Sequence, residues 1–130
     1  MVTGTSKRNI AGIIFSSLNN RDLSLLTNYL DESATFDFPG TNLIKGRKRI
    51  LTFFKILFRK YSKLSFNVEK TIEEGDQVCV LWTNQGITGK GNPYNNRGIT
   101  FVHIREGKIH FISDYFKDTS FVNAASSGSV

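Results

Sequence analysis

The chain has 130 residues, a length that suits one domain with a substantial core and leaves no room for two. Its formal net charge of +6 permits an anionic partner, but this moderate excess is ordinary for a small soluble domain, so we expect no nucleic-acid partner. The single cysteine, Cys79, excludes an intrachain disulfide, fits a reducing compartment and lies in a strand-like run as a small buried side chain would.

The first apolar run, residues 10–15, is too short and too polar at its flanks for a signal peptide or a membrane span. We therefore expect a cytoplasmic protein without a membrane partner. We also expect a single domain over residues 6–120, with flexible termini at residues 1–5 and 121–130, where the last residues are small and have nothing to bury.

Three helices and one short strand are predicted in the first half. Apolar residues recur at helical spacing over residues 6–18 and again over residues 23–30, and Asn19-Asn20 separates the two helices. Residues 34–38 form a brief strand that Pro39-Gly40 ends. A third helix begins at Gly46 and runs to about residue 61, with a broad apolar face.

The third helix also carries much of the positive charge. Residues 45–63 include eight basic residues and no acidic one. Lys48, Lys55 and Arg59 fall on one stripe opposite the apolar face, which is typical of a solvated outer surface. A membrane-surface or phosphate-binding role is the alternative interpretation of this stripe.

Four strands are predicted in the second half, as two hairpins. Residues 64–74 and 77–89 are joined at Gly75-Asp76, a glycine-first two-residue loop, and counting outwards from it places Glu69 opposite Trp82 and Asn67 opposite Asn84. The glycine-rich link that follows is no phosphate loop, because it lacks the Gly-Lys-Ser/Thr ending and precedes a strand.

The second hairpin, residues 94–118, turns at Glu106-Gly107, where glycine can adopt the positive φ of a tight turn. Counting outwards predicts that His103 faces His110 and that Ile99 faces Asp114. One face of this hairpin would then carry Arg97, Ile99, Phe101, His103, His110, Ile112, Asp114 and Phe116, and the other Val102, Ile104, Ile109, Phe111 and Tyr115. Both faces are largely apolar, so one should face a core or pocket and the other a second subunit.

The predicted order is helix, helix, short strand, helix and a four-stranded meander. This order indicates an α+β fold, a cone-shaped barrel in which a strongly curved antiparallel sheet wraps around a long helix. Aromatic side chains that line such a cone make a pocket for a small molecule.

This pattern resembles the nuclear transport factor 2-like superfamily, and within it the SnoaL-like branch, which is related to polyketide cyclases and ketosteroid isomerases. The resemblance covers about residues 6–120. It is carried by residues 18–23 at the first helix junction, Phe36-Asp37-Phe38-Pro39-Gly40, Gly46, Glu74-Gly75-Asp76 with Val78, Val80 and Trp82, residues 93–96, Gly107-Lys108-Ile109 and residues 114–118. The superfamily hosts isomerases, dehydratases, hydrolases, cyclases and binding proteins, so the fold alone does not name a reaction.

Most of the family's catalytic groups are replaced in this sequence. The positions of the steroid isomerase tyrosine, base and protonated acid are held by Ile14, Phe38 and the Thr100-Phe101 region, so steroid isomerase activity is not expected. An Asp-Arg-Asp set of the epoxide hydrolase kind could use Asp114 and Arg97 but lacks its second acid. The paired histidines of scytalone dehydratase relatives could be matched only by His103 and His110, close to the hairpin tip.

Asp114 is the acid that remains, at the position where the resemblance places the acid/base aspartate of polyketide cyclases. Dehydration of Asp114 should raise its pKa, and the positive charge of Arg97 should lower it by a smaller amount. The alternative interpretation is a structural role, in which Asp114 forms an ion pair with Arg97 or a hydrogen bond with a backbone amide. The predicted ligand-binding residues are Phe38, Glu69, Trp82, Asn84, Arg97, Ile99, Phe101, Ile112 and Phe116, with Tyr29, Tyr94 and Asn96 as weaker candidates at the rim.

The sequence therefore predicts a domain that binds a small hydrophobic molecule, aromatic or polyketide-like. If it is an enzyme, it performs isomerase- or cyclase-type acid/base chemistry through Asp114 without metal or organic cofactor, since no cluster of Cys, His and Asp has the spacing of metal ligands. The rival prediction is a non-enzymatic carrier or sensor, or a dimeric association module. A homodimer through the outer face of the sheet is also expected, as the resemblance implies.

Overall fold

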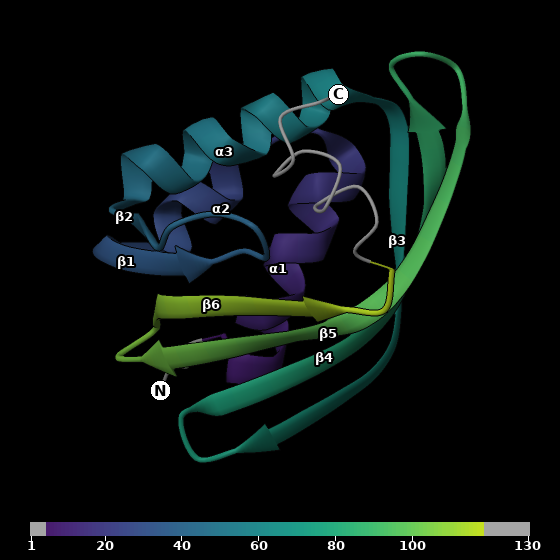
Figure 1. Cartoon of the computed structure of the whole chain (residues 1–130). Helices are drawn as coiled ribbons and strands as arrows, with labels where there is room; N and C mark the ends of the chain where they lie inside the picture. Colours follow the sequence, from purple (N-terminus) through teal and green to yellow (C-terminus); the bar gives the residue numbers. More distant parts are fainter. Residues whose placement is uncertain (1–4, 119–130) are drawn as a thin grey trace.

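In this computed structural model, which describes residues 5–118, a curved sheet holds two long helices on its concave side (Figure 1). The elements follow the predicted order with one added strand. They are α1 (Lys7–Asn20), α2 (Ser24–Tyr29), β1 (Leu30–Asp37), β2 (Ile44–Lys45), α3 (Arg47–Lys60), β3 (Tyr61–Glu74), β4 (Gln77–Thr88), β5 (Pro93–Arg105) and β6 (Lys108–Phe116). Of the termini expected to be flexible, residues 1–5 and 121–130, only Thr5 belongs to the described residues. The predicted domain boundaries, residues 6–120, stay a prediction.

Helix α1 is bounded at both ends by local hydrogen bonds. The Ser6 hydroxyl accepts from the Asn9 amide at 3.2 Å, and Arg21 ends the helix in the left-handed conformation at φ 54°. The Arg21 guanidinium then donates to the carbonyl oxygens of Phe58 and Tyr61, at 2.7 and 2.5 Å. This residue therefore ties the end of α1 to the junction of α3 and β3.

The six strands lie in the order β2-β1-β6-β5-β4-β3. Strands β3 to β6 form the predicted antiparallel meander. The predicted curved antiparallel sheet also has one parallel pair, β1 with β6, so the whole sheet is mixed. The short β2 and helix α3 separate β1 from β3 in the chain, so a local hairpin rule cannot place β1.

Among several irregularities in strand pairing, two β-bulges change the predicted register of the hairpins. In β6 an extra residue, His110, lies between the pairs Ile104–Ile109 and His103–Phe111. In β3 the extra residue is Glu69, between the pairs Val68–Trp82 and Lys70–Leu81. A bulge adds one residue to one strand, kinks it and turns every later side chain to the opposite face.

The shift corrects the predicted pairs of the second hairpin. Asp114 lies opposite Thr100 and not Ile99, and His103 lies opposite Phe111 and not His110. The inward residues of β5 are the even-numbered ones along the whole strand.

The predicted outer patch is corrected for the same reason. Val102, Ile104 and Ile109 are fully buried in the core instead of forming an outer surface. The outer face carries Ile99 and Phe101, which were expected in the pocket, together with Phe111 and Tyr115.

The core fills the concave side of the sheet. Helix α1 packs against strands β3 to β6, and α3 packs against β1, β2 and β3 (Figure 1). The basic side chains Lys48, Lys55 and Arg59 of α3 are exposed, while Ile50 and Phe54 of the same helix are buried. The amphipathic pattern predicted for this helix is therefore observed.

Candidate functional site

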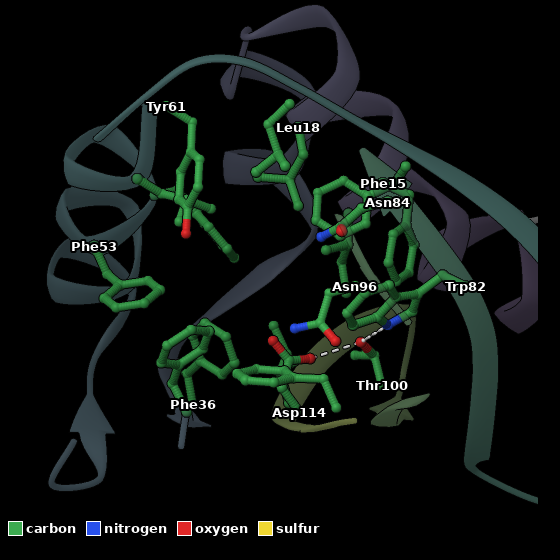
Figure 2. Close-up of a pocket in the computed structure, with 18 of the residues that line it drawn as sticks. Phe15, Leu18, Phe36, Phe53, Tyr61, Trp82, Asn84, Asn96, Thr100 and Asp114 are labelled. Atoms are coloured by element: carbon green, nitrogen blue, oxygen red, sulfur yellow. Dashed lines mark hydrogen bonds between the residues drawn. The ribbon is translucent and has the colours of Figure 1, made fainter. Parts of the chain in front are cut away.

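A cavity of about 50 Å³ lies between the concave face of the sheet and helices α1 and α3 (Figure 2). Most of its wall is aromatic or aliphatic. The lining residues are Ile14, Phe15, Leu18, Phe36, Phe38, Phe53, Phe54, Leu57, Tyr61, Leu64, Phe66, Trp82, Asn84, Tyr94, Asn96, Thr100, Ile112, Asp114 and Phe116. Asp114 is the only Asp, Glu, His, Lys or Arg among them.

Asp114 is held by a short chain of hydrogen bonds. The Thr100 hydroxyl donates to Asp114 Oδ1 at 2.6 Å, and the Trp82 Nε1–H donates to Thr100 Oγ1 at 2.9 Å (Figure 2). Because the Trp82 donor fixes the orientation of the Thr100 hydroxyl, the hydroxyl proton points to the carboxylate. The three residues come from β4, β5 and β6, and their cross-strand placement sets this geometry.

The pKa of Asp114 is raised from 3.8 to about 7. Burial is the main cause, because dehydration disfavours the charged carboxylate. The Thr100 hydrogen bond acts in the opposite direction, and the negative charge of Asp37 adds to the increase. Asp114 can therefore both accept and donate a proton near neutral pH.

Two tyrosines add hydroxyl groups to the cavity wall. The rings of Tyr61 and Tyr94 lie 5.0 Å apart, and their hydroxyls share a hydrogen bond. Burial raises the pKa of both, so both hydroxyls stay protonated at neutral pH. Asn96 Nδ2 also donates to the Tyr94 hydroxyl, at 3.0 Å.

The structure places six of the predicted site residues together. Phe38, Trp82, Asn84, Ile112 and Phe116 line the cavity with Asp114. The Trp82 and Phe116 ring centroids lie 6.4 Å apart, and those of Phe38 and Phe116 lie 5.5 Å apart. These rings form a nearly continuous aromatic surface beside the carboxyl group.

Four other predicted ligand-binding residues lie elsewhere. Arg97, Ile99 and Phe101 are outward-facing residues of β5, and Glu69 is the exposed extra residue of the β3 bulge. The register error explains all four, because an uncounted residue in each hairpin moves odd-numbered positions to the other face. Arg97 is not among the groups that shift the pKa of Asp114.

The two histidines do not form a cavity pair. Neither His103 nor His110 lines the cavity, and His110 Nδ1 lies 4.0 Å from Asp31 Oδ2 of the adjacent β1. Tyr29, a weaker rim candidate, is also outside the cavity lining, whereas Tyr94 and Asn96 belong to it.

Thr100 and Tyr61 are site residues that the sequence did not identify. Thr100 lies in an apolar run, and only the corrected register reveals that it faces Asp114. The predicted third helix runs to about residue 61, but Tyr61 is the first residue of β3. Its position follows from the sharp change from helix to strand after Lys60, for which the sequence has no glycine or proline signal.

Within residues 5–118, no group of three or more His, Cys, Asp or Glu side chains is arranged to hold a metal ion. None of the helices in this described part is both long and apolar enough to cross a membrane.

Comparison with known families and structures is consistent with this fold. Residues 14–112 match the sequence model of the family described as SnoaL-like domain. No curated protein matches the chain at a significant level.

Solved structures match over nearly the whole chain. A protein from Pseudomonas putida KT2440, assigned as a polyketide cyclase, has a TM-score of 0.84 at 18% identity and covers 92% of this chain and 98% of its own. An NTF2-like protein of unknown function from Burkholderia pseudomallei K96243 has a TM-score of 0.81 at 15% identity, with 92% and 97% covered. TerC, co-crystallised with polyporic acid, has a TM-score of 0.79 at 17% identity, with 91% and 97% covered. At these identities the matches establish the fold, which is NTF2-like.

Proposed function

This chain belongs to the SnoaL-like domain family, and we propose that it binds a small hydrophobic molecule in the cavity and moves a proton of that molecule through Asp114. The observation that carries the proposal is the state of Asp114, a dehydrated carboxyl group with a pKa of about 7 beside an aromatic wall. A group with such a pKa is matched to general acid/base catalysis at neutral pH.

The proposed reaction is an isomerase- or cyclase-type proton transfer. The Asp114 carboxylate removes a proton from the carbon next to a carbonyl group, and the electron pair of the broken C–H bond moves to the carbonyl oxygen as an enolate. Asp114 then returns the proton to the ligand, so that the aspartate is regenerated without a cofactor.

The size of the cavity limits how a ligand enters. About 50 Å³ holds only a few water molecules, whereas pockets for drug-sized ligands measure about 300–1,000 Å³. The side chains of Phe38, Phe53 and Phe116 are only half-buried. We infer that these rings change rotamer to admit a ligand of more than one ring.

A non-enzymatic carrier or sensor is the second candidate function. It is favoured by the cavity lining within residues 5–118, which has one carboxyl group and no second ionic side chain. The neighbour co-crystallised with polyporic acid supports a small-molecule ligand for either function.

The test is deuterium exchange at the carbon next to the carbonyl of 1-tetralone, a bicyclic ketone, followed by NMR in D₂O. The wild type should exchange this position faster than buffer, with a rate that rises with pH, is half-maximal near pH 7 and levels off about one pH unit higher, where Asp114 is ionised. Asp114→Asn should reduce the rate to the buffer level. The control Asp76→Asn, at an exposed ion pair with Lys7, should leave it unchanged.

Equal exchange by Asp114→Asn and the wild type would contradict the catalytic role of Asp114. Binding of 1-tetralone by the wild type without any exchange would favour the carrier.

A further inference from the structure

Asn84, a residue of the cavity lining, has a buried amide oxygen without a hydrogen-bond partner among the described residues. The residue is 8% exposed and lies on the concave face of β4, opposite Asn96 of β5. Its Oδ1 is buried and accepts no hydrogen bond from the residues that the structure describes. Burial of an unpaired polar group costs free energy, so the position requires a compensating partner.

Asn96, directly opposite, shows what a structural asparagine does in this sheet. Its Nδ2 donates to the Tyr94 hydroxyl at 3.0 Å and to the Asp118 carbonyl at 2.9 Å. Its Oδ1 accepts from the backbone amides of Arg97 at 2.9 Å and Asp118 at 3.0 Å. Asn96 therefore stabilises the end of the β5–β6 hairpin, whereas the Asn84 oxygen has no such role within residues 5–118.

Asn84 and Asp114 belong to different ends of the same cavity (Figure 2). Asn84 lies level with Asn96 and Asp114 level with Thr100, four residues further along β5. At ~3.3 Å per residue this offset is at most about 13 Å along the strand. A ligand that contacts both groups is thus longer than a single ring.

The surface between the two groups is aromatic, and the ring planes of Trp82 and Phe116 are inclined at 54° to each other. Gly98 occupies the intervening inward position of β5, with Trp82 opposite it in β4 and Phe116 opposite it in β6. A Cβ at Gly98 would overlap the backbone of Tyr115 and Phe116, so this position has no side chain to interrupt the surface. Planar rings of a ligand can lie against it.

We propose that Asn84 recognises a hydroxyl group at the end of the ligand remote from Asp114. The ligand class is then a planar hydrophobic molecule of two or more rings with a hydroxyl at its far end. A hydroxyl group both donates and accepts a hydrogen bond, and so does a carboxamide, so the match holds for either orientation of the Asn84 amide. The inference that the other end of the ligand reacts at Asp114 rests on the proposed function. The recognition of the hydroxyl by Asn84 does not depend on it.

The test compares the binding of 1-tetralone and 6-hydroxy-1-tetralone, which carries a hydroxyl on the ring remote from the ketone. The single indole N–H resonance reports binding, because Trp82 is the only tryptophan and lines the cavity. The wild type should bind the hydroxylated compound about tenfold more tightly, because 1-tetralone leaves the buried Asn84 amide oxygen unpaired and the hydroxyl of the other compound pairs with it. Asn84→Leu should bind both compounds equally, because leucine offers no hydrogen bond to the hydroxyl.

Stability provides an independent readout. Asn84→Leu removes an unpaired polar group from an apolar wall, so the free protein should be at least as stable as the wild type. Asn84→Ala should lose the preference for the hydroxyl as well. The control Asn95→Leu, on the exposed face of the neighbouring strand, should retain the preference.

A tenfold preference that survives in Asn84→Leu and Asn84→Ala would overturn the proposal, as would the absence of a preference in the wild type. A marked loss of stability in Asn84→Leu would also overturn it, because the amide would then be a structural group. Failure of Asp114 to exchange protons leaves the ratio of the two affinities unchanged, so the two proposals fail separately.

Discussion

Dehydration of Asp114 links one residue to the pH dependence of stability. Its pKa in the folded protein, about 7, lies above the value of 3.8 for an unperturbed carboxyl. The folded state therefore binds a proton that the unfolded state has released between these values. The contribution of Asp114 to stability is largest below about pH 4 and falls as the pH rises to about 7.

Asp114→Asn should remove this dependence. An asparagine oxygen can still accept the Thr100 hydrogen bond, and no charge has to be buried. The free energy of unfolding of the variant, relative to the wild type, should rise by up to about 4 kcal/mol between pH 4 and pH 8, at ~1.36 kcal/mol per pKa unit. Urea unfolding at both pH values measures this difference, and a pH-independent difference would contradict the raised pKa.

Asp37 should tune the pKa of Asp114 from outside the cavity. It is exposed at the end of β1, and its negative charge raises the pKa of Asp114. Asp37→Asn should therefore lower that pKa, as measured by NMR titration of the Asp114 carboxyl. Glu32→Gln, an exposed change on the same strand that does not act on Asp114, is the matched control. An unchanged titration in Asp37→Asn would exclude this coupling.

The sequence was sufficient to predict that Asp114 faces inward but not which residues face it. Ile112, Asp114 and Phe116 alternate along one strand, so their common face follows from counting within β6 alone. Ile99, Phe101 and Arg97 were assigned by counting across the turn, where the extra residue His110 intervenes. Thr100, the actual partner of Asp114, was missed for the same reason.

At the scale of the elements, the order of helices and strands was predictable and the bulges were not. The glycine at each hairpin turn is a clear local signal, and Gly75 and Gly107 both have the positive φ that such turns require. Glu69 and His110, the extra residues of the two bulges, have no such signal in the sequence. Their positions depend on how the strands pack against α1 and β1, which sequence periodicity does not encode.

Gly98 should be essential to the close approach of β5 and β6. A Cβ there would meet Phe116 Cβ at 2.8 Å and overlap the Tyr115 backbone. Gly98→Ala should therefore lower the free energy of unfolding by about 1–3 kcal/mol, the usual cost of overpacking.

Gly12→Ala is the matched control for this change. Gly12 lies within helix α1, and a Cβ there meets nothing within 4 Å. Alanine should instead raise the free energy of unfolding by about 0.5–1 kcal/mol, because it favours the helix. Equal effects of the two substitutions in chemical unfolding would refute the steric account of Gly98.

At the scale of the whole molecule, the outer face of the sheet remains apolar after the register is corrected. Ile72, Ile99 and Tyr115 are 49%, 39% and 62% exposed. On the same face, the ring of Phe101 in β5 packs against the ring of Phe111 in β6. Exposed apolar side chains on one sheet face are typical of an association surface. The expected homodimer therefore stays a prediction, now with these residues at its interface.

Sedimentation at micromolar concentration measures the oligomeric state. The wild type should be a dimer, and Ile99→Lys should shift it to a monomer, because a lysine would be buried without a partner. Ile56→Lys is the control, since Ile56 is 48% exposed but lies on helix α3, away from the outer face. A monomeric wild type would refute the predicted interface.

The cavity, the fold and the family together make Asp114 the centre of the proposed chemistry. The most direct measurement is the NMR titration of its carboxyl group, with and without 1-tetralone in the cavity. A midpoint near pH 7 that changes when 1-tetralone is added is the predicted result. A midpoint at or below the ordinary value of 3.8, or one that does not respond to a bound cavity ligand, would contradict the account.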